Sequence, residues 1–394
     1  MIILQGKRNS ATVFAEKIDK ETKKKISELL SDEAFSDSKV RIMPDAHSSK
    51  SAVVGTAMTL CGRVRPSLLG PDIGCGMEAV FLREKEADLE KLDKIIHEQI
   101  PCGKEIRENA IADFDFGALY CKDAVDTGRA ARSLGTLGGG NHFIELDRCE
   151  DGTLVLIIHS GSRSLGSGVA EYYEHEAFRA MCKKERKKAR SAYYEERGEG
   201  VPAKMNRKGK SPVKIVRENA VLEGKLFEMY LHDIAIVQEF AQKNRRLMAE
   251  IICREMGFSV ESSFSCVHNF IEAEHMMLRK GAISARMGER VIVPLNMRDG
   301  AVIGTGLGNP EWNFSAPHGA GRACARHEAK KAFTVEEYRA QMAGIYTTTA
   351  TEGSLDECPM AYKSPEKILP FLAETVEIEQ IVKPIYNFKS CEQS

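Results

Sequence analysis

The chain has 394 residues, of which 43% are hydrophobic, so it is long enough to bury a large core. Its formal net charge of -1 excludes a global positive field, and a polyanionic partner therefore needs a local basic surface. No apolar stretch approaches the roughly 20 residues of a membrane helix, and the apolar run at the N-terminus is too short for a signal peptide. We expect a soluble cytoplasmic protein that does not bind membranes.

Helical and strand-like segments alternate irregularly along the chain. Residues 89–100 and 225–256 carry apolar side chains at helical spacing among charges, and the second segment stops at Gly257. Runs rich in β-branched or aromatic residues predict strands at 153–158, 263–270, 290–295 and 301–306. This order predicts an α+β fold, with a single mixed domain over residues 1–394, and argues against a regular βαβ array.

Residues 183–214 differ from the rest of the chain because they are basic and poor in aliphatic side chains, with two prolines and several glycines. We interpret this segment as an insertion. It is either a solvated helix followed by a surface loop or an arm that binds polyanions, and the composition is compatible with both.

The eleven cysteines are scattered from Cys61 to Cys391 without a CxxC pair. An odd number at irregular spacing argues against a disulfide framework and against a zinc site made mainly of cysteines. Most of these thiols are expected to be reduced.

Several histidines follow strand-like runs and stand next to glycine, asparagine or serine, namely His142, His159, His268 and His318. Side chains at such strand ends are held toward a cleft by a rigid scaffold. Asp72 and Cys75, in GPDIGCGM, add a carboxylate and a thiol on glycine-rich backbone. Together these groups suit a first-row dication such as Zn²⁺, Mn²⁺, Fe²⁺ or Co²⁺, and a thiolate can bridge two ions. The alternative is a polar core rich in histidine.

The glycines of GGGNHF and HGAGR predict backbone cradles for anions. We expect a helix over residues 319–329, directly after His318, with Arg322 one turn further on. A histidine held against a phosphate can act as a nucleophile if its other ring nitrogen is fixed and a cation neutralises the leaving group. Nucleotidyl transfer through a phosphoramidate is therefore a chemically coherent hypothesis.

Other polar residues have two interpretations each. Arg163, Lys280 and Lys363 are single cations among small or apolar residues, which suits either phosphate contacts or surface charges. Asp45 and His47, in MPDAH, suit either a partner of a metal ligand or a simple turn.

The motifs MPDAH, GPDIGCGM, GGGNHFIE, HSGSRSLG, VHNF, RKGA, SAPHGAGR and AYK, in this order, resemble those of the RtcB family of RNA-splicing and RNA-repair ligases. The likeness extends from about residue 41 to YNFK at 386–389. It implies a large α+β domain with a central metal and nucleotide cleft. It also implies an enzyme that depends on GTP and Mn²⁺ and joins RNA with a 2',3'-cyclic phosphate or 3'-phosphate to RNA with a 5'-hydroxyl. An archease-type activator is a further candidate partner.

The resemblance also assigns roles by position. His318 would be the nucleophile that takes GMP from GTP. Two manganese ions would share the thiolate of Cys75 within the ligand set Asp72, Cys75, His142, His159 and His268. The guanosine nucleotide would be bordered by Asn141, Phe143, Glu145, Pro294, His318, Ala320, Gly321, Tyr362 and Lys389.

Two stretches depart from the family pattern, SSKS at 48–51 and PLNMRDG at 294–300, so we expect the nucleotide contacts to differ there. Two other functions compete with ligation. A dinuclear metal phosphoesterase acting on RNA ends would need only the metals and an activated water. A non-catalytic RNA-end binder would have gaps in the ligand set, and none of the key positions is missing.

Overall fold

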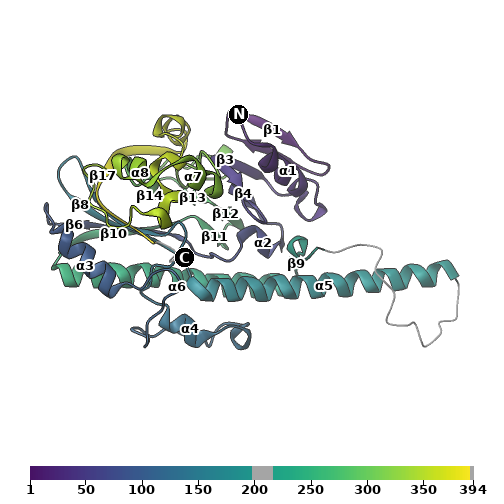
Figure 1. Cartoon of the computed structure of the whole chain (residues 1–394). Coiled ribbons are helices and arrows are strands. Elements are labelled where there is room, and N and C mark those ends of the chain that lie inside the picture. The colour runs from purple at the N-terminus through teal and green to yellow at the C-terminus, as the bar shows by residue number, and fades with distance from the viewer. Residues whose placement is uncertain (198–215, 391–394) are drawn as a thin grey trace.

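Two large β-sheets form the body of the molecule (Figure 1), whose computed structural model describes residues 1–197 and 216–390. In the six-stranded sheet the order is β1-β2-β3-β4-β12-β11, and all neighbours are antiparallel except β2 and β3. Its strands are β1 (Ile2–Gln5), β2 (Ser10–Val13), β3 (Val40–Ser48), β4 (Val53–Thr59), β11 (Asn269–Glu272) and β12 (Met277–Lys280).

The seven-stranded sheet is antiparallel throughout, in the order β10-β6-β8-β7-β17-β15-β14. Every residue of β6 and β8 is buried, because alternate side chains enter two different hydrophobic clusters on the two faces. The strands are β6 (Gly76–Leu82), β7 (Phe143–Arg148), β8 (Leu154–Ser160), β10 (Val260–Val267), β14 (Arg290–Asn296), β15 (Gly300–Gly306) and β17 (Val376–Lys389).

Smaller elements complete the fold. Two short ribbons pair β13 (Ala282–Ser284) with β16 (Ser315–Pro317), and β5 (Arg63–Val64) with β9 (Leu222–Glu223). The α-helices are α1 (Lys20–Leu29), α2 (Pro66–Leu69), α3 (Leu89–Gln99), α4 (Thr127–Arg132), α5 (Arg163–Arg197), α6 (Lys225–Met256), α7 (Arg326–Ala332), α8 (Val335–Gln341) and α9 (Leu369–Leu372). The 3₁₀ helices are η1 (Glu33–Phe35), η2 (Lys122–Ala124), η3 (Arg217–Asn219), η4 (Pro310–Trp312), η5 (Glu352–Glu357), η6 (Pro359–Ala361) and η7 (Pro365–Lys367).

Helix α6 connects the cores beneath the two sheets, and Figure 1 shows it running under the body of the molecule. Its N-terminal half places Phe227, Ile234 and Val237 in one hydrophobic cluster, and its C-terminal half places Met248 and Ile252 in another. The helix ends at Gly257 in the left-handed conformation, as the sequence predicts. The same helix therefore fixes the position of one sheet relative to the other.

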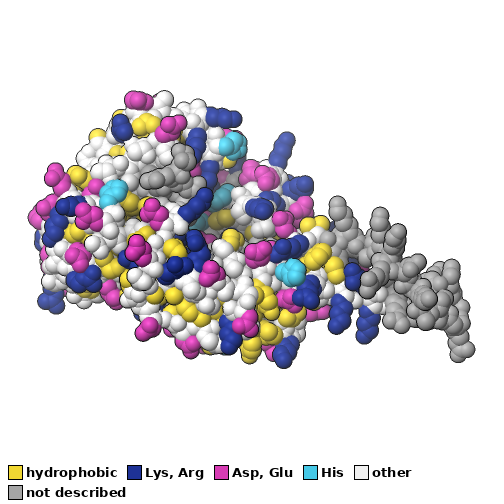
Figure 2. Space-filling model, turned by 60° about the horizontal axis from the view of Figure 1, so that its bottom comes forward, with side chains coloured by type: hydrophobic (Ala, Val, Ile, Leu, Met, Phe, Trp, Pro, Cys, Tyr) yellow, Lys and Arg dark blue, Asp and Glu magenta, His cyan; other side chains and the backbone are white. Residues whose placement is uncertain are grey.

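Helix α5 packs against α6 along its N-terminal half and then extends away from the body (Figure 1). Figure 2 shows Lys and Arg side chains along the described part of this arm. The first half of the predicted insertion is thus helical up to Arg197, and residues 198–215 lie outside the described part of the chain.

Most predicted elements are present, with two differences. The helices expected at 89–100 and 225–256 are α3 and α6, and the strand expected at 263–270 is divided at His268 into β10 and β11. The helix expected over 319–329 is wrong for residues 319–325, because α7 begins only at Arg326. Gly321 has a φ of +74° and its missing Cβ leaves room for the backbone oxygen of Asp45, 2.7 Å from the ideal Cβ position. Contact with β3 therefore holds this segment in an irregular conformation.

Among the described residues, no helix combines the length and the apolar character that a membrane crossing requires.

Candidate metal centre and nucleotide pocket

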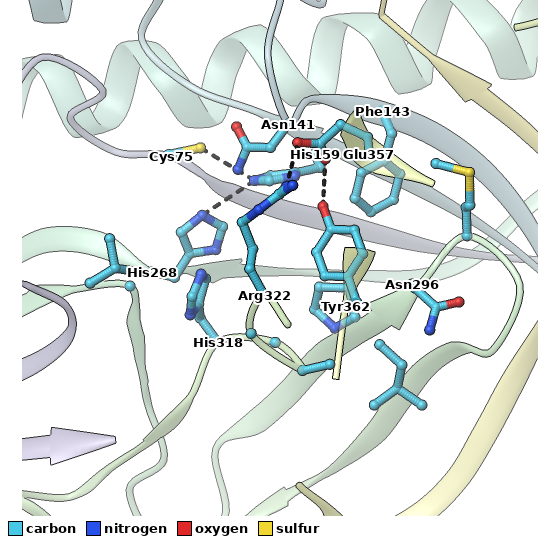
Figure 3. A pocket seen from close by; sticks show the side chains of 18 of the residues that line it. Cys75, Asn141, Phe143, His159, His268, Asn296, His318, Arg322, Glu357 and Tyr362 are labelled. Carbon is cyan, nitrogen blue, oxygen red and sulfur yellow. Dashed lines mark hydrogen bonds and ion pairs between the residues drawn. The ribbon is translucent and has the colours of Figure 1, made fainter. Parts of the chain in front are cut away.

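A cavity of about 220 Å³ is lined by residues of both large sheets. Figure 3 shows side chains that surround it: Cys75, His159 and His268 lie together, and dashed lines join Glu357 to Arg322 and to Tyr362. All residues predicted to border the nucleotide line this cavity: Asn141, Phe143, Glu145, Pro294, His318, Ala320, Gly321, Tyr362 and Lys389. Of the predicted metal ligands, Asp72, Cys75, His159 and His268 line it as well.

Two groups of ligand atoms share the thiol of Cys75. One consists of Cys75, His159 and His268, and the other of Asp72, Cys75 and His142. Within each group, all ligand atoms lie within 4.8 Å of one another. The structure therefore brings the five predicted ligands together around the shared thiol of Cys75.

The ring nitrogens that face inward in this cluster are the Nε2 atoms. Sγ of Cys75 lies 3.3 Å from Nε2 of His159, which in turn lies 3.2 Å from Nε2 of His268 (Figure 3). Sγ of Cys75 also lies 3.5 Å from Nε2 of His142. Nε2 of His142 is also 3.5 Å from Oδ2 of Asp72. So many lone pairs directed at one small volume fit a divalent cation, which accepts electrons from all of them.

The protonation of the cluster also suits metal binding. Burial, reinforced by His142, lowers the pKa of His159 well below its usual value, and burial with His159 does the same for His268. These imidazoles are neutral at physiological pH, which is the form that coordinates metals. Burial and the charge of Asp72 raise the pKa of the Cys75 thiol in the metal-free protein. A bound cation would deprotonate that thiol outright.

Strand ends and helix α6 position these ligands. His159 is the second-last residue of β8, where it pairs with Met77 of β6 and Phe143 of β7. The N–H of His268 donates to the carbonyl of Cys75 at 2.9 Å. The fully buried Arg245 of α6 donates to the carbonyls of Gly74 and Ser160 at 2.8 and 3.0 Å. Backbone next to two ligands is thus fixed by one side chain.

The glycine that makes room for Asp72 is Gly161 of HSGSRSLG, since an ideal Cβ there would lie 2.1 Å from Oδ1 of Asp72. Gly76, in GPDIGCGM itself, instead lets β6 approach the backbone of β10. Gly74 lets the chain approach helix α6, because an ideal Cβ there would lie 2.8 Å from Cβ of Ala241. The glycines beside Cys75 therefore serve packing against β10 and α6, and a distant glycine admits the carboxylate.

His318 is held by a buried carboxylate. Its Nδ1 lies 2.6 Å from Oδ2 of Asp45, and its backbone N–H donates to the same oxygen at 3.2 Å. Asp45 lies within β3, so it occupies a strand and not the turn that was one interpretation of MPDAH. Because Nδ1–H donates to the carboxylate, Nε2 keeps its lone pair. The His318 ring is 5.1 Å from the ring of His268, which places this nitrogen beside the metal cluster.

At the other end of the cavity, Glu357 contacts four polar side chains. It is 2% exposed and bonds to Arg322, Arg326, Tyr362 and Lys389. Sequence reasoning missed Glu357 and Arg326, since nothing in LDECP or ACARHE distinguishes them from surface charges.

Two carboxyl groups lie next to each other beneath the predicted guanosine site. Glu145 and Asp147 point to the same face of β7, and Nδ2 of Asn387 donates to Glu145 at 3.2 Å. Both carboxyl oxygens of Asp147 are buried without a hydrogen-bond partner among the described residues. Burial raises the pKa of Glu145 to about 7 and, together with Glu145, raises the pKa of Asp147 well above its usual range.

The three single cations have different surroundings. Arg163 lines a second cavity of about 290 Å³ together with Lys104 and Arg129, and Asp72 belongs to the walls of both cavities. Lys280 is half-buried, interacts electrostatically with Asp72 and donates to the carbonyl of Leu69 at 2.7 Å. Lys363 donates to the carbonyl of Pro44 at 3.0 Å and so holds β3 next to Asp45.

Both departures from the family pattern form closed local networks. Asn296 donates to Asp299 at 2.7 Å and accepts from the backbone N–H groups of Arg298 and Asp299 at 3.0 Å, so its amide is used within its own loop. In the other stretch, Lys25 of α1 donates to the carbonyl of Ser49, which ties the SSKS loop to that helix.

Comparison with known proteins agrees with this site. The family model described as tRNA-splicing ligase RtcB matches residues 30–127 and 118–390. RNA-splicing ligase RtcB1 of Escherichia coli strain ATCC 25922 is 30% identical over 392 residues, covering 89% of this chain and 90% of the relative. RNA-splicing ligase RtcB of Escherichia coli K12 is 29% identical over the same shares, and tRNA-splicing ligase RtcB of Aeropyrum pernix is 28% identical over 64% of this chain and 58% of its own. The chain therefore belongs to the RtcB family.

Proposed function

We propose that this protein is an RNA ligase that uses GTP to join an RNA 3'-phosphate end to an RNA 5'-hydroxyl end through a GMP adduct of His318. The observation that carries the proposal is the position of His318. Its Nδ1 is fixed on Asp45, and its ring lies 5.1 Å from His268 of the metal cluster, within a cavity lined by cationic side chains. The names of the relatives, RNA-splicing and tRNA-splicing ligases, support the same class of reaction.

In the first step, Nε2 of His318 attacks the α-phosphorus of GTP. The nitrogen–phosphorus bond forms as the bond from that phosphorus to the bridging oxygen of pyrophosphate breaks, and pyrophosphate leaves. Asp45 accepts the Nδ1–H throughout, which stabilises the positive charge that the ring gains. Arg322 and Arg326 line the cavity and supply positive charge for the triphosphate oxygens.

In the later steps, an oxygen of the RNA 3'-phosphate attacks the phosphorus of the GMP adduct and breaks its bond to His318. The 5'-hydroxyl oxygen of the second RNA then attacks the activated 3'-phosphate, and GMP leaves as the new phosphodiester forms. An RNA that ends in a 2',3'-cyclic phosphate first undergoes hydrolysis to the 3'-monophosphate.

The residues present fit two manganese ions. Asp72, Cys75, His142, His159 and His268 would hold them, and such ions would neutralise charge on phosphate oxygens near the leaving groups. The basic second cavity suits an RNA phosphate, because Lys104, Arg129 and Arg163 meet there next to Asp72. An archease-type activator belongs to the proposal as a candidate partner.

The test is incubation of the purified protein with α-³²P-GTP and MnCl₂, followed by denaturation and detection of label on the chain. We expect an acid-labile label on the wild type that is absent from His318→Ala. His327→Ala, which changes an exposed histidine of α7, is the matched control and should be labelled like the wild type.

The opposite result would also be informative. A wild type that binds Mn²⁺ but gains no label would overturn the proposal at its first step, and hydrolysis of RNA 2',3'-cyclic phosphate would then be the activity to assay.

A further inference from the structure

We propose that Glu357 is a positioning residue that sets the preference for guanine, by holding Lys389 and Tyr362 in the arrangement that a guanine base requires. The inference rests on the proposed function. It concerns a residue to which neither the family motifs nor the roles assigned above give a part.

Glu357 uses its two carboxylate oxygens for two different parts of the cavity. Oε1 lies 3.1 Å from Nη1 of Arg322 and 2.5 Å from Nη1 of Arg326, on the segment that follows His318. Oε2 accepts from the hydroxyl of Tyr362 at 2.5 Å and lies 2.9 Å from Nζ of Lys389. Figure 3 shows Glu357 between Arg322 and Tyr362.

The contacts connect segments that are distant in sequence. Glu357 ends η5 and Lys389 ends β17. Nζ of Lys389 also donates to the carbonyl of Asn141 at 2.8 Å. Asn141 precedes the metal ligand His142. One carboxylate therefore fixes the base end of the cavity relative to the metal end.

Positive charges outnumber negative charges in this cluster, because the carboxylate of Glu357 faces three cations. Asp356 lies 2.7 Å from Arg326, which compensates part of the difference. Burial by itself would disfavour ionisation of Glu357, but Lys389, Arg326 and the hydroxyl of Tyr362 hold its pKa at about 2. Glu357 is thus ionised at all physiological pH values, and the cluster retains a positive charge that suits an electron-rich ligand edge.

These contacts have a direct consequence for base selection. Guanine presents the carbonyl oxygen O6 where adenine presents an amino group, so an ammonium donor at a fixed place favours guanine. Lys389 has a long flexible side chain, and its ammonium group would otherwise sample many positions. Contacts with Glu357 and with the carbonyl of Asn141 restrict this ammonium group to a single position.

In the described part of the chain, Glu357 does not contact the residues proposed to attack GTP or to hold the metal ions. It bonds to none of the metal ligands and not to His318, according to its described contacts. Loss of its charge should therefore weaken recognition of the base while leaving the nucleophile and the metal cluster in place.

The experiment compares Glu357→Gln with Glu352→Gln, which changes an exposed glutamate of the same 3₁₀ helix. Guanylation of His318 is measured with GTP and with ATP, alongside Mn²⁺ affinity and melting temperature. For Glu357→Gln we expect KM for GTP to rise by about tenfold or more, the effect of losing one charge-assisted hydrogen bond. The rate at saturating GTP and the activity with ATP should change little, so the GTP to ATP ratio falls.

A second pair of variants tests whether Glu357 acts through Lys389. If it does, the double variant Glu357→Gln/Lys389→Gln should have the same KM for GTP as Lys389→Gln alone. Tripolyphosphate, which lacks a base, should inhibit Glu357→Gln at least as strongly as it inhibits the wild type, because a competing carboxylate has been removed from Arg322 and Arg326.

Two outcomes would overturn the inference: a GTP to ATP ratio that is unchanged, whether or not both activities fall, or additive effects in the double variant. Failure of the proposed function is distinguishable from these, since the wild type itself would then gain no label from GTP.

Discussion

The two ends of the central cavity differ in how far they are complete without a ligand. At the metal end, the Nε2 atoms of His159 and His268 face each other at 3.2 Å, and the Nδ1 atoms of both rings are buried without a hydrogen-bond partner among the described residues. At the base end, the carboxylate of Glu357 is engaged by four side chains. At the base end the protein alone satisfies the carboxylate of Glu357, while Glu145 and Asp147 keep buried oxygens without a partner among the described residues. At the metal end the facing ring nitrogens suit a cation.

The two ends therefore differ in how binding of a ligand changes their stability. A cluster of neutral donors gains stability only when an ion binds, because the desolvation of its polar groups is otherwise uncompensated. A cluster of opposite charges is already oriented before the ligand arrives, which lowers the entropy lost on binding. We expect removal of the metal ion to lower the stability of the metal end. We expect removal of a charged side chain to weaken ligand binding at the base end.

The largest effect should come from His318→Ala, because it removes the proposed nucleophile. Guanylation should fall by a factor of about 1,000 or more. The metal cluster contains no atom of His318, so the Mn²⁺ affinity, measured by isothermal titration, should remain within about threefold of the wild type. Residual label on another residue in this variant would contradict the assignment.

Cys75→Ser should break the metal end as a whole, since both ligand groups use this sulfur. Addition of Mn²⁺ at about 100 times its Kd should stabilise the wild type by about 2.7 kcal/mol per ion, and this increase should be lost in the variant. Differential scanning calorimetry with Mn²⁺ and with EDTA measures it. Cys253→Ala, at a buried free cysteine outside the cavity, serves as the control that keeps the metal response.

Asp45→Asn should have a smaller effect on the same end. The amide can still accept from Nδ1 of His318 but carries no charge to stabilise the cationic ring, so guanylation should fall by about 100-fold or more. Rapid-quench measurement at saturating GTP isolates this step. A loss that appears only in KM for GTP would show that Asp45 acts on nucleotide binding and not on the histidine.

The smallest effect is expected from Asp147→Asn at the base end. This substitution should change how the free energy of unfolding depends on pH. The pKa of Asp147 is raised in the folded state, so the folded protein holds a proton that the unfolded chain releases above about pH 4. Stability of the wild type should therefore fall as the pH rises above that value.

The Asp147→Asn variant, which has no proton to lose at that position, should gain on the order of 1 kcal/mol relative to the wild type at pH 8, and less at pH 5. Urea unfolding at the two pH values measures the difference. A gain that is equal at both pH values would show that the effect comes from packing and not from ionisation.

Part of this architecture could be predicted from the sequence because the relevant patterns are local. Apolar spacing predicts α3 and α6, Gly257 predicts where α6 ends, and the ligand residue types predict a metal cluster. The segment 319–325 could not be predicted in this way. Its residues suit a helix, but Gly321 has a φ of +74° and packs against the backbone of Asp45, and α7 begins only at Arg326.

The sequence by itself determined the chemistry available to this protein: five ligand side chains, a histidine next to glycines, and motifs that resemble one family of ligases. The tertiary structure decided which groups act on one another. Asp45 and His318 are 273 positions apart, and Glu357 meets Lys389 only because η5 and β17 enclose the same cavity. Such pairs depend on the packing of distant segments, and no local pattern in the chain records them.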